Sequence, residues 1–550
     1  MRLLRVYIDG YRNLKNVTVD FDKDSLTTVV IGENGSGKSN LIEAIVEIFR
    51  AWDLRRPNEL KFSYRIEYAI AADFVTLNSP GMMSSLNPHY MQLGSHFIPD
   101  QPWATCQSIS QIGNLDTQRS TIGEVPVEFL PDLVFGYYSG SGQRLERLFD
   151  RHQTRYYDVI NKERPRIEYQ IAREQRRLFY CRPSHGSLAL LAYLAKPHGD
   201  DGPGELLTER LGITGFHSAL ALLKQPSWYK GSQIAAFRET GSLWGAHGPA
   251  GDCARALRDT AFHAIELEGT AVDDYRRGAS KEAQLACFLR DEKSLRKFAA
   301  NYKSDREMFA ALEAADISDL FRDMTVWVAR TNDASGDISF SDLSDGERQL
   351  LMVLGLIRVS RGREALFLLD EPDTHLNPAW QLTYLDLIRE WTEVAADEDK
   401  CQIIMTTHNP LTIAALEAKE VRVMSADDDG NISVAQPRID PKGLGFAGVL
   451  TDIFGLSSSL DKPTQEKIDR RNELARETVL DPAMAKEFAD IKEELRHLGF
   501  LYEERDKLYS EFLRQLDNVE LADVDPLTPD ELLAREAESR EIVERLLKKP

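Results

Sequence analysis

Three short apolar runs lie far apart in the chain, and each ends where polar residues begin: residues 26–31, 365–369 and 403–405. Apolar runs of this length without alternation are typical of strands buried on both faces of a parallel sheet. After the first run comes a short polar loop, and apolar residues then recur at helical spacing from Leu41 to Phe49. This order of strand, loop and helix predicts an α/β fold.

The rest of the chain has different patterns. Residues 146–179 are charged and helix-like, residues 186–196 and 216–224 are apolar, and residues 251–312 predict amphipathic helices. No a/d heptad pattern persists over three repeats, so we expect compact, mostly helical structure in this stretch and no coiled coil. Residues from about 79 to 122 are polar and irregular.

Charged helix-forming residues dominate from about residue 456 onward. One apolar stripe runs from Leu501 to Leu516, and a second helix begins at Thr528-Pro529, where the threonine is a good N-cap and the proline suits the first helical position. These stripes predict helices that either pack back on the rest of the chain or dock a partner protein.

Composition narrows the class of protein. The 550 residues are 42% hydrophobic and 28% charged, as in globular proteins, and they exceed a single compact domain. No apolar run is long enough for a transmembrane helix, the first residues lack a signal-peptide pattern, and the five cysteines show no C-x-x-C spacing. We therefore expect a cytoplasmic protein without membrane contact, disulfide framework or zinc ribbon.

The net charge of −21 gives no support to a generic nucleic-acid binder, although it permits a local basic groove. One basic stripe stands out: Arg164, Arg166, Arg173, Arg176, Arg177 and Arg182. Glu163, Glu168 and Glu174 are interspersed with it, so it is either a nucleic-acid contact or a solvated helical face.

The loop after the first apolar run has the G-x-x-x-x-G-K-S pattern of a phosphate-binding loop. Its glycines let successive N–H groups point at one anion, and the following helix adds its positive dipole end. The lysine can reach the β- and γ-phosphates of ATP, and the serine hydroxyl can bind Mg²⁺. The predicted ATP-binding residues are Gly32, Glu33, Asn34, Gly35, Ser36, Gly37, Lys38, Ser39 and Asn40.

The second and third runs end in residues that complete an ATPase. Asp370 ends the strand at residues 365–369 and is predicted to hold Mg²⁺, because a carboxylate at the tip of a buried strand meets the phosphate loop there. Glu371 follows and is assigned as the general base for the attacking water. His408 ends the next strand and is predicted to donate a ring N–H to the γ-phosphate.

Before the Asp370 strand lies a glycine-containing helix start. Ser344 is a good N-cap, and Glu347 stands three residues later as its capping-box partner. The order Ser344, Asp345, Gly346, Glu347, then Asp370 and Glu371, then His408, resembles the signature, Walker B and switch segments of ATP-binding-cassette ATPases. Gln143 is either the glutamine that senses Mg²⁺ and water in such enzymes or an ordinary loop residue.

More than half of the chain separates Lys38 from Ser344. With the opening strand, this layout resembles SMC-like and RecF-like ATPase heads and implies a fold of two lobes with a large, mostly helical insertion and a helical tail. The expected domains are residues 1–145 (lobe I), 146–334 (insertion), 335–456 (lobe II) and 457–550 (tail). Three consecutive aspartates, 427–429, predict a hairpin turn more than a metal cluster, and we expect no nuclease site.

The segments at residues 137–143 and 445–456 resemble the PtuA family, the SMC-like ATPases of Septu-type and retron-associated bacterial anti-phage systems. The resemblance implies an HNH-type nuclease partner (PtuB-like) and, in retrons, a reverse transcriptase with its DNA–RNA product.

A phosphate loop alone leaves the γ-phosphate half exposed, so we expect a homodimer that sandwiches ATP, with the Ser344–Glu347 segment of one copy closing the site of the other. The alternatives are a RecF-like DNA-repair ATPase that acts directly on DNA and, less in keeping with the motif spacing, a transporter motor.

Overall fold

The computed structural model describes residues 1–71, 73–80, 102–108, 119–122, 129–195, 207–209, 211–229, 243–270, 281–331, 333–359, 364–393, 401–427, 429–455, 460–476 and 481–498. The chain forms two compact units, Met1–Gly455 and Leu456–Pro550. In the described ranges no helix is both long and apolar enough to span a membrane.

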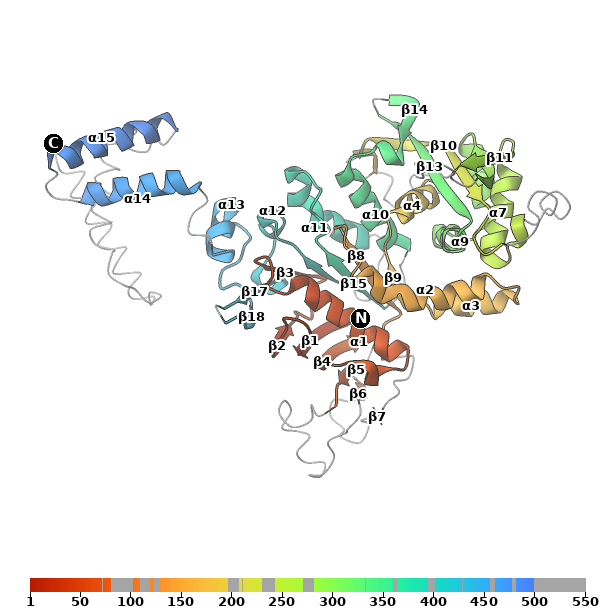
Figure 1. Ribbon diagram of the computed structural model, residues 1–550, viewed down its shortest axis with the longest axis horizontal. Helices are drawn as coiled ribbons and strands as arrows, with labels where there is room; N and C mark the ends of the chain where they lie inside the picture. Colours follow the sequence, from red (N-terminus) through yellow and green to blue (C-terminus); the bar gives the residue numbers. More distant parts are fainter. Residues whose placement is uncertain are drawn as a thin grey trace. The chain divides into compact units, whose positions relative to one another are not determined.

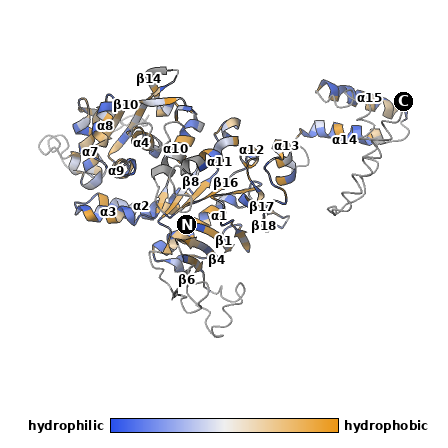
Figure 2. Cartoon of the chain, turned by 180° about the vertical axis from the view of Figure 1, so that it is seen from behind, coloured by the Kyte–Doolittle hydropathy of each residue, from blue (hydrophilic) through white to orange (hydrophobic). Residues whose placement is uncertain are grey.

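A seven-stranded sheet lies at the centre of the first unit (Figure 1). Its neighbours from β17 to β9 are parallel, and β18 pairs antiparallel at one edge. The three apolar runs are its central strands, which are buried on both faces and orange in the hydropathy view (Figure 2). The order is β18 (Ile432–Ala435), β17 (Val421–Ala426), β3 (Thr27–Gly32), β16 (Cys401–Thr406), β15 (Ala365–Asp370), β8 (Leu133–Tyr138) and β9 (Leu178–Tyr180).

The phosphate-loop helix α1 (Lys38–Asp53) packs between this sheet and a second, antiparallel sheet. Residues of α1, of β1 and β4, and of the inner strands share one hydrophobic core. Part of the region expected to be irregular, residues 79–122, is strand, because β6 and β7 extend the second sheet by regular pairing. The sheet order is β2 (Val17–Asp20), β1 (Arg2–Asp9), β4 (Ser63–Ile70), β5 (Asp73–Asn78), β6 (Trp103–Ser108) and β7 (Arg119–Ile122).

The insertion contains the expected helices and also a five-stranded antiparallel sheet that the sequence analysis missed. Residues 265–270 and 281–289 are strands, so the prediction of helices throughout residues 251–312 is wrong there. The reason is visible in β12, where Leu285, Cys287 and Leu289 are buried at every second position, which is strand spacing. The sheet order is β11 (Ile265–Thr270), β12 (Lys281–Leu289), β10 (Ile213–Lys224), β13 (Phe321–Arg330) and β14 (Asp333–Ser339).

Six helices accompany this sheet in residues 146–334 of the described chain: α2 (Glu146–Ile160), α3 (Arg166–Glu174), α4 (Ser184–Leu194), α7 (Gly248–Thr260), α8 (Glu292–Ala299) and α9 (Asp305–Ile317). Helix α4 packs against α9 and also against α10 (Asp345–Val359), the helix that follows Ser344. The contact with α10 is close, because a Cβ on Gly355 of α10 would lie 3.1 Å from the Cβ of Ala189 of α4. One hydrophobic core therefore runs from the central sheet into the insertion.

Lobe II adds α11 (Pro378–Glu393), the short α12 (Pro410–Ile413) and α13 (Gly445–Gly448), and a π-helical turn at Val449–Ile453. The second unit contains two charged helices, α14 (Lys462–Arg476) and α15 (Pro482–His497). The ion pair of Arg470 with Glu487, at 2.8 Å, joins them. The predicted stripe from Leu501 to Leu516 and the helix expected after Thr528 lie outside the described residues. The proposed domain boundaries stay predictions.

Candidate functional site

The phosphate loop follows β3 at the carboxyl edge of the central sheet. Gly32 has a φ of 150°, and a Cβ there would lie 2.1 Å from the carbonyl oxygen of Met424, so only glycine fits. Gly37 has a φ of 95° and caps α1 in the left-handed conformation. Lys38 folds over the loop, since its Nζ donates to the carbonyl oxygens of Gly32 at 2.8 Å and of Glu33 at 3.0 Å.

Asp370 lies against the phosphate loop although far from it in sequence. Its Oδ1 accepts a hydrogen bond from Ser39 Oγ at 3.2 Å and another from the hydroxyl of Thr406. The parallel register places Asp370 opposite Thr406, so β16 supplies this second donor. Burial raises the pKa of Asp370, while the two hydroxyls and Lys38 oppose that rise. Burial likewise lowers the pKa of Lys38, and the nearby carboxylates oppose it.

Glu371 leaves the strand in a left-handed backbone conformation, with a φ of 53°. Such strain in a non-glycine residue costs about 1–3 kcal/mol and is concentrated at functional sites. The N–H of Glu371 donates to the carbonyl oxygen of Thr406 at 3.1 Å, which holds the turn. Its Oε2 lies 2.9 Å from Nδ1 of His408, so the predicted base and the predicted switch histidine are adjacent.

The segment after Glu371 is tied to the segment around His408. Asp373 is buried and accepts hydrogen bonds from the hydroxyls of Thr407, at 2.7 Å to Oδ2, and of Thr412. Burial raises the pKa of Asp373, and these hydroxyls oppose that rise. Hydrogen bonds thus join the residue before His408 to the segment that follows β15 and to α12.

The signature segment begins α10, and the predicted capping box is confirmed. Ser344 N donates to Glu347 Oε2 at 2.8 Å, and Glu347 N donates to Ser344 Oγ at 3.3 Å. Ser344 and Asp345 are exposed, whereas Gly346 is buried against the turn after β15. A Cβ on Gly346 would lie 2.6 Å from the carbonyl oxygen of His375.

The sequence did not predict a polar cluster at α1, which is formed by Arg12, Asn40, Glu43 and Arg144. Glu43 is buried on α1 and forms ion pairs with Arg12 at 2.6 Å and Arg144 at 2.9 Å. Asn40 is part of the cluster, because its Oδ1 accepts from Arg144 at 2.7 Å. Burial raises the pKa of Glu43, and Arg12 opposes that rise. Arg12, Glu43 and Arg144 lie far apart in sequence, so no local pattern could have indicated the cluster.

Gln143 is exposed in the loop between β8 and α2, directly before Arg144. Its backbone carbonyl oxygen accepts from Arg147 N at 3.1 Å. Ser139 N, in the same loop, donates to the carbonyl oxygen of Asp370 at 3.2 Å, so the loop borders the nucleotide motifs. The Mg²⁺-sensing role of Gln143 stays a prediction.

Asp427 and Asp429 lie at the turn between the antiparallel strands β17 and β18, as predicted. Asp427 N donates to the carbonyl oxygen of Asn431 at 3.0 Å, and the Asp427 carboxylate accepts from Asn431 N at 2.7 Å. Within the described ranges no group of three or more potential ligands is arranged to hold a metal.

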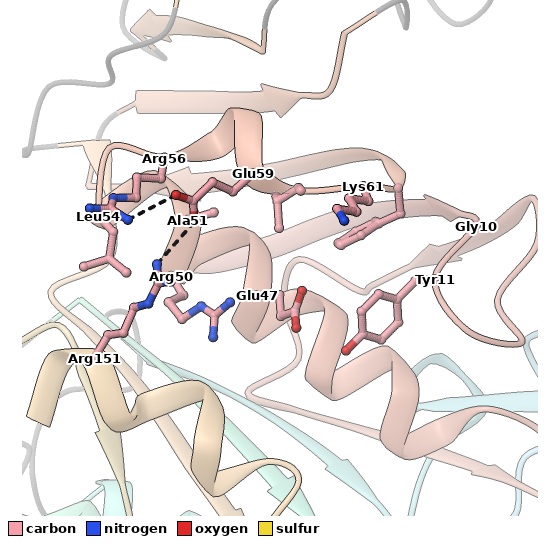
Figure 3. A pocket seen from close by; sticks show the side chains of 12 residues that line it. Gly10, Tyr11, Glu47, Arg50, Ala51, Leu54, Arg56, Glu59, Lys61 and Arg151 are labelled. Atoms are coloured by element: carbon pink, nitrogen blue, oxygen red, sulfur yellow. Dashed lines mark hydrogen bonds and ion pairs between the residues drawn. The ribbon is translucent and has the colours of Figure 1, made fainter.

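A separate cavity of about 300 Å³ lies beside the middle and end of α1 (Figure 3). Glu59 bridges Arg56 at 3.1 Å and Arg151 at 3.2 Å across it, and Tyr11 forms one wall. None of the predicted nucleotide-site residues lines this cavity.

The loop residues fit a triphosphate and Mg²⁺. Ser36 Oγ is buried without a hydrogen-bond partner among the described residues, and the Cβ position of Gly35 has no neighbour within 4 Å. Such an orphaned donor in a glycine cradle suits a phosphate oxygen. Hydroxyl and carboxylate oxygens, as in Ser39 and Asp370, are the ligands that Mg²⁺ prefers.

Comparisons with protein families agree with an ATPase. Residues 158–414 match the family described as "AAA domain, putative AbiEii toxin, Type IV TA system", and residues 1–83 match the family described as "AAA ATPase domain". The two matches include the phosphate loop, Asp370, Glu371 and His408.

Two curated relatives are Septu proteins PtuA. The chain is 30% identical to that of Bacillus thuringiensis over 169 residues, covering 24% of this chain and 40% of the relative. It is 28% identical to that of Bacillus mycoides (strain KBAB4) over 201 residues, covering 33% of this chain and 27% of the relative. The matched part is thus less than half of the length of either relative.

Solved structures with matches include an Smc head domain of Pyrococcus furiosus bound to the C-terminal domain of ScpA (TM-score 0.28, 12% identity, covering 79% of this chain and 96% of that one). The recombination mediator RecF bound to ATP also matches (TM-score 0.25, 13% identity, covering 79% and 97%).

Proposed function

We propose that this chain, which is related to part of the Septu protein PtuA, is an ATPase that dimerises on ATP and thereby regulates a partner nuclease in anti-phage defence. The observation that carries the proposal is the junction at Asp370. This carboxylate accepts from Ser39 of the phosphate-loop helix, and the adjacent Glu371 contacts His408. Three remote segments thus meet with the residue types that phosphoryl transfer to water requires.

Each side chain has a defined task in this proposal. The loop N–H groups and Lys38 bind the triphosphate. Ser39 and Asp370 would hold Mg²⁺, which would neutralise negative charge on the phosphates. Glu371 accepts the proton of the attacking water, and His408, 2.9 Å from Glu371, orients that carboxylate and donates to the γ-phosphate.

Dimerisation is supported by the exposure of the signature segment. Ser344 and Asp345 are exposed at the start of α10, where the helix N-terminus offers backbone N–H donors to an anion. In the proposal they complete the γ-phosphate site of a second copy, so ATP stabilises the closed dimer and hydrolysis releases it.

The partners are proposed from the relatives. Septu similarity supports an HNH-type nuclease subunit, PtuB-like, and a retron reverse transcriptase with its DNA–RNA product as a further associate. In this proposal the nuclease chemistry belongs to the partner.

Glu371→Gln tests the core of the proposal. The variant should bind ATP with near wild-type affinity, hydrolyse it about 10²–10³-fold more slowly, and accumulate as a dimer in light scattering with ATP. Glu292→Gln, at an exposed ion pair in the insertion, is the matched control and should behave as wild type. A Glu371→Gln protein that hydrolyses ATP normally, or stays monomeric with ATP, contradicts the proposal.

A further inference from the structure

The six arginines of the basic stripe fall into two classes: those with a carboxylate or carbonyl partner and those without an ion-pair partner among the described residues. Four of its six members have carboxylate or carbonyl partners: Arg164 pairs with Glu168, Arg176 with Glu313 at 2.7 Å, and Arg182 with Glu146 at 2.9 Å, while Arg177 donates to the carbonyl oxygen of Pro131 at 2.7 Å. Arg176 and Glu313 are both nearly inaccessible, so this pair holds the fold and is not a ligand contact.

The other two, Arg166 and Arg173, have no ion-pair partner in the part of the chain that the structure describes. Both are on α3, a helix without a single buried residue. The Nε atom of Arg173 is buried and has no hydrogen-bond partner among the described residues. A buried guanidinium nitrogen without an acceptor can donate to the oxygen of a bound ligand.

Arg166 and Arg173 line the same cavity. It has a volume of about 540 Å³ and is bounded by side chains of α2, α3, α7 and α9 and of the loop before α9. In Figure 1 these four helices cluster within the insertion. Three tyrosines also line the cavity: Tyr156, Tyr169 and Tyr302.

Two of the three carboxylates in the wall have an arginine of their own. Asp252 pairs with Arg255 at 2.6 Å, and Asp259 pairs with Arg258 at 3.0 Å. The third, Glu307, accepts from the backbone N–H of Lys303 at 2.8 Å, which leaves its charge in place. Arg166 and Arg173 therefore exceed the one carboxylate of the wall that has no ionic partner among the described residues by one positive charge.

The ring of Tyr169 is held in a fixed position in the aromatic wall. Tyr169 OH donates to the carbonyl oxygen of Lys162 at 2.7 Å and accepts from the N–H of Arg164 at 2.8 Å. Its ring lies directly against Gly248 at the start of α7, where a Cβ would be 2.6 Å from the ring. A ring fixed in this way can stack on a base without losing conformational freedom.

We propose that this cavity binds a phosphate-bearing nucleoside, either a free nucleotide or one unit of a single-stranded nucleic acid. Arg166 and Arg173 contact the phosphate, and the tyrosine wall receives the base, a combination typical of single-strand sites. The site is distinct from the phosphate loop and does not depend on the proposed ATPase. In this proposal the chain binds a second nucleotide in the cavity, in addition to ATP at the phosphate loop.

The test uses the full-length chain carrying Lys38→Ala, so that the phosphate loop does not contribute. The probes are a fluorescein-labelled oligothymidylate of about 12 nucleotides, followed by anisotropy at several salt concentrations, and the nucleoside monophosphates, followed by calorimetry. Single strands lose about 0.7 in the slope of log K against log salt for each phosphate contact, so Arg166→Ala with Arg173→Ala should flatten that slope by up to about 1.4. Monophosphate binding should weaken by at least about tenfold.

Two matched proteins keep the result specific. Arg290→Ala with Arg296→Ala removes the same charge outside the cavity and should bind as the parent does. Arg166→Lys with Arg173→Lys keeps the charge and should restore the salt slope. Binding of the oligomer alone or of monophosphates alone identifies the source of the ligand.

Three outcomes overturn the inference: neither probe binds the parent, both probes bind the alanine variant unchanged, or duplex DNA competes as well as single strands. A normal thermal midpoint for the alanine variant shows that loss of binding is not loss of fold. Nucleotide binding to a chain with an intact Lys38 reports on the phosphate loop separately, so failure of the ATPase proposal is distinguishable.

Discussion

Thr406 is the residue whose role emerged only from the structure, and Thr406→Val tests it. Thr406 is fully buried, and valine has nearly the same shape, so the change removes a hydroxyl and little packing. The lost hydroxyl donates to Asp370 Oδ1 and accepts from the Glu371 N–H at 3.2 Å. The Glu371 N–H keeps its other acceptor, the Thr406 carbonyl oxygen at 3.1 Å, which continues to hold the turn at the general base.

The magnitude follows from the charge on Asp370. Hydrogen bonds to charged groups contribute about 1.5–3 kcal/mol, and each 1.4 kcal/mol is a factor of ten. Without this donor the ionised carboxylate is less stable in its buried position, so its pKa rises further and its affinity for Mg²⁺ falls. We expect the Mg²⁺ concentration for half-maximal ATPase activity to rise by about 10- to 100-fold, a range typical of residues that orient metal ligands.

The assay is a Mg²⁺ titration of ATP hydrolysis at saturating ATP, with ATP binding in the presence of EDTA measured alongside. Thr406→Val should leave the EDTA value unchanged, and Thr406→Ser, which restores the hydroxyl, should return the Mg²⁺ dependence to that of the wild type. Thr383→Val, at a half-buried position on α11, is the control for the substitution itself. A wild-type Mg²⁺ half-saturation in Thr406→Val refutes the assignment.

Three further predictions concern the same site. Lys38→Ala should lose nucleotide affinity while keeping the far-ultraviolet circular dichroism of the wild type; a titration with a fluorescent ATP analogue measures this, and unchanged affinity counts against the phosphate-loop role. Gly346→Ala places a Cβ 2.6 Å from the His375 carbonyl oxygen and should lower the free energy of unfolding by about 1–3 kcal/mol in urea, whereas Gly142→Ala in an exposed loop should be neutral; equal stabilities disprove the close contact. Because burial raises the pKa of Asp370 above its ordinary value, the nucleotide-free protein gains stability as pH falls through that pKa, and Mg²⁺-dependent ATP binding is lost over the same window; Asp370→Asn should abolish this window, and its persistence would mean that another group titrates.

The central strands and the phosphate loop were predictable because their signals are local. The loop glycines directly follow an apolar run, and Asp370 directly ends another, so neighbouring residues define both features. The Ser344–Glu347 capping box was predictable for the same reason, since a four-residue spacing suffices.

The insertion sheet and the arginine partners were not predictable, because they depend on contacts between distant segments. Strands β10 and β13 pair across about a hundred residues, and Arg176 finds Glu313 on another helix. Nothing near Arg176 in sequence distinguishes it from Arg173, which keeps its charge available. The left-handed backbone of Glu371 was equally hidden, since it results from its bonds to β16.

Helix α4 has a consequence for evolution and engineering. It comes from the segment between the nucleotide motifs, yet it packs directly on the helix that begins at the signature segment. Removing this segment would remove the helix that packs on α10. The segment therefore cannot be exchanged between relatives independently of α10. We expect sequence variation among relatives to be confined to the outer helices and loops of this segment. Residues of α4 that contact α10 should change only together with the α10 residues that they contact.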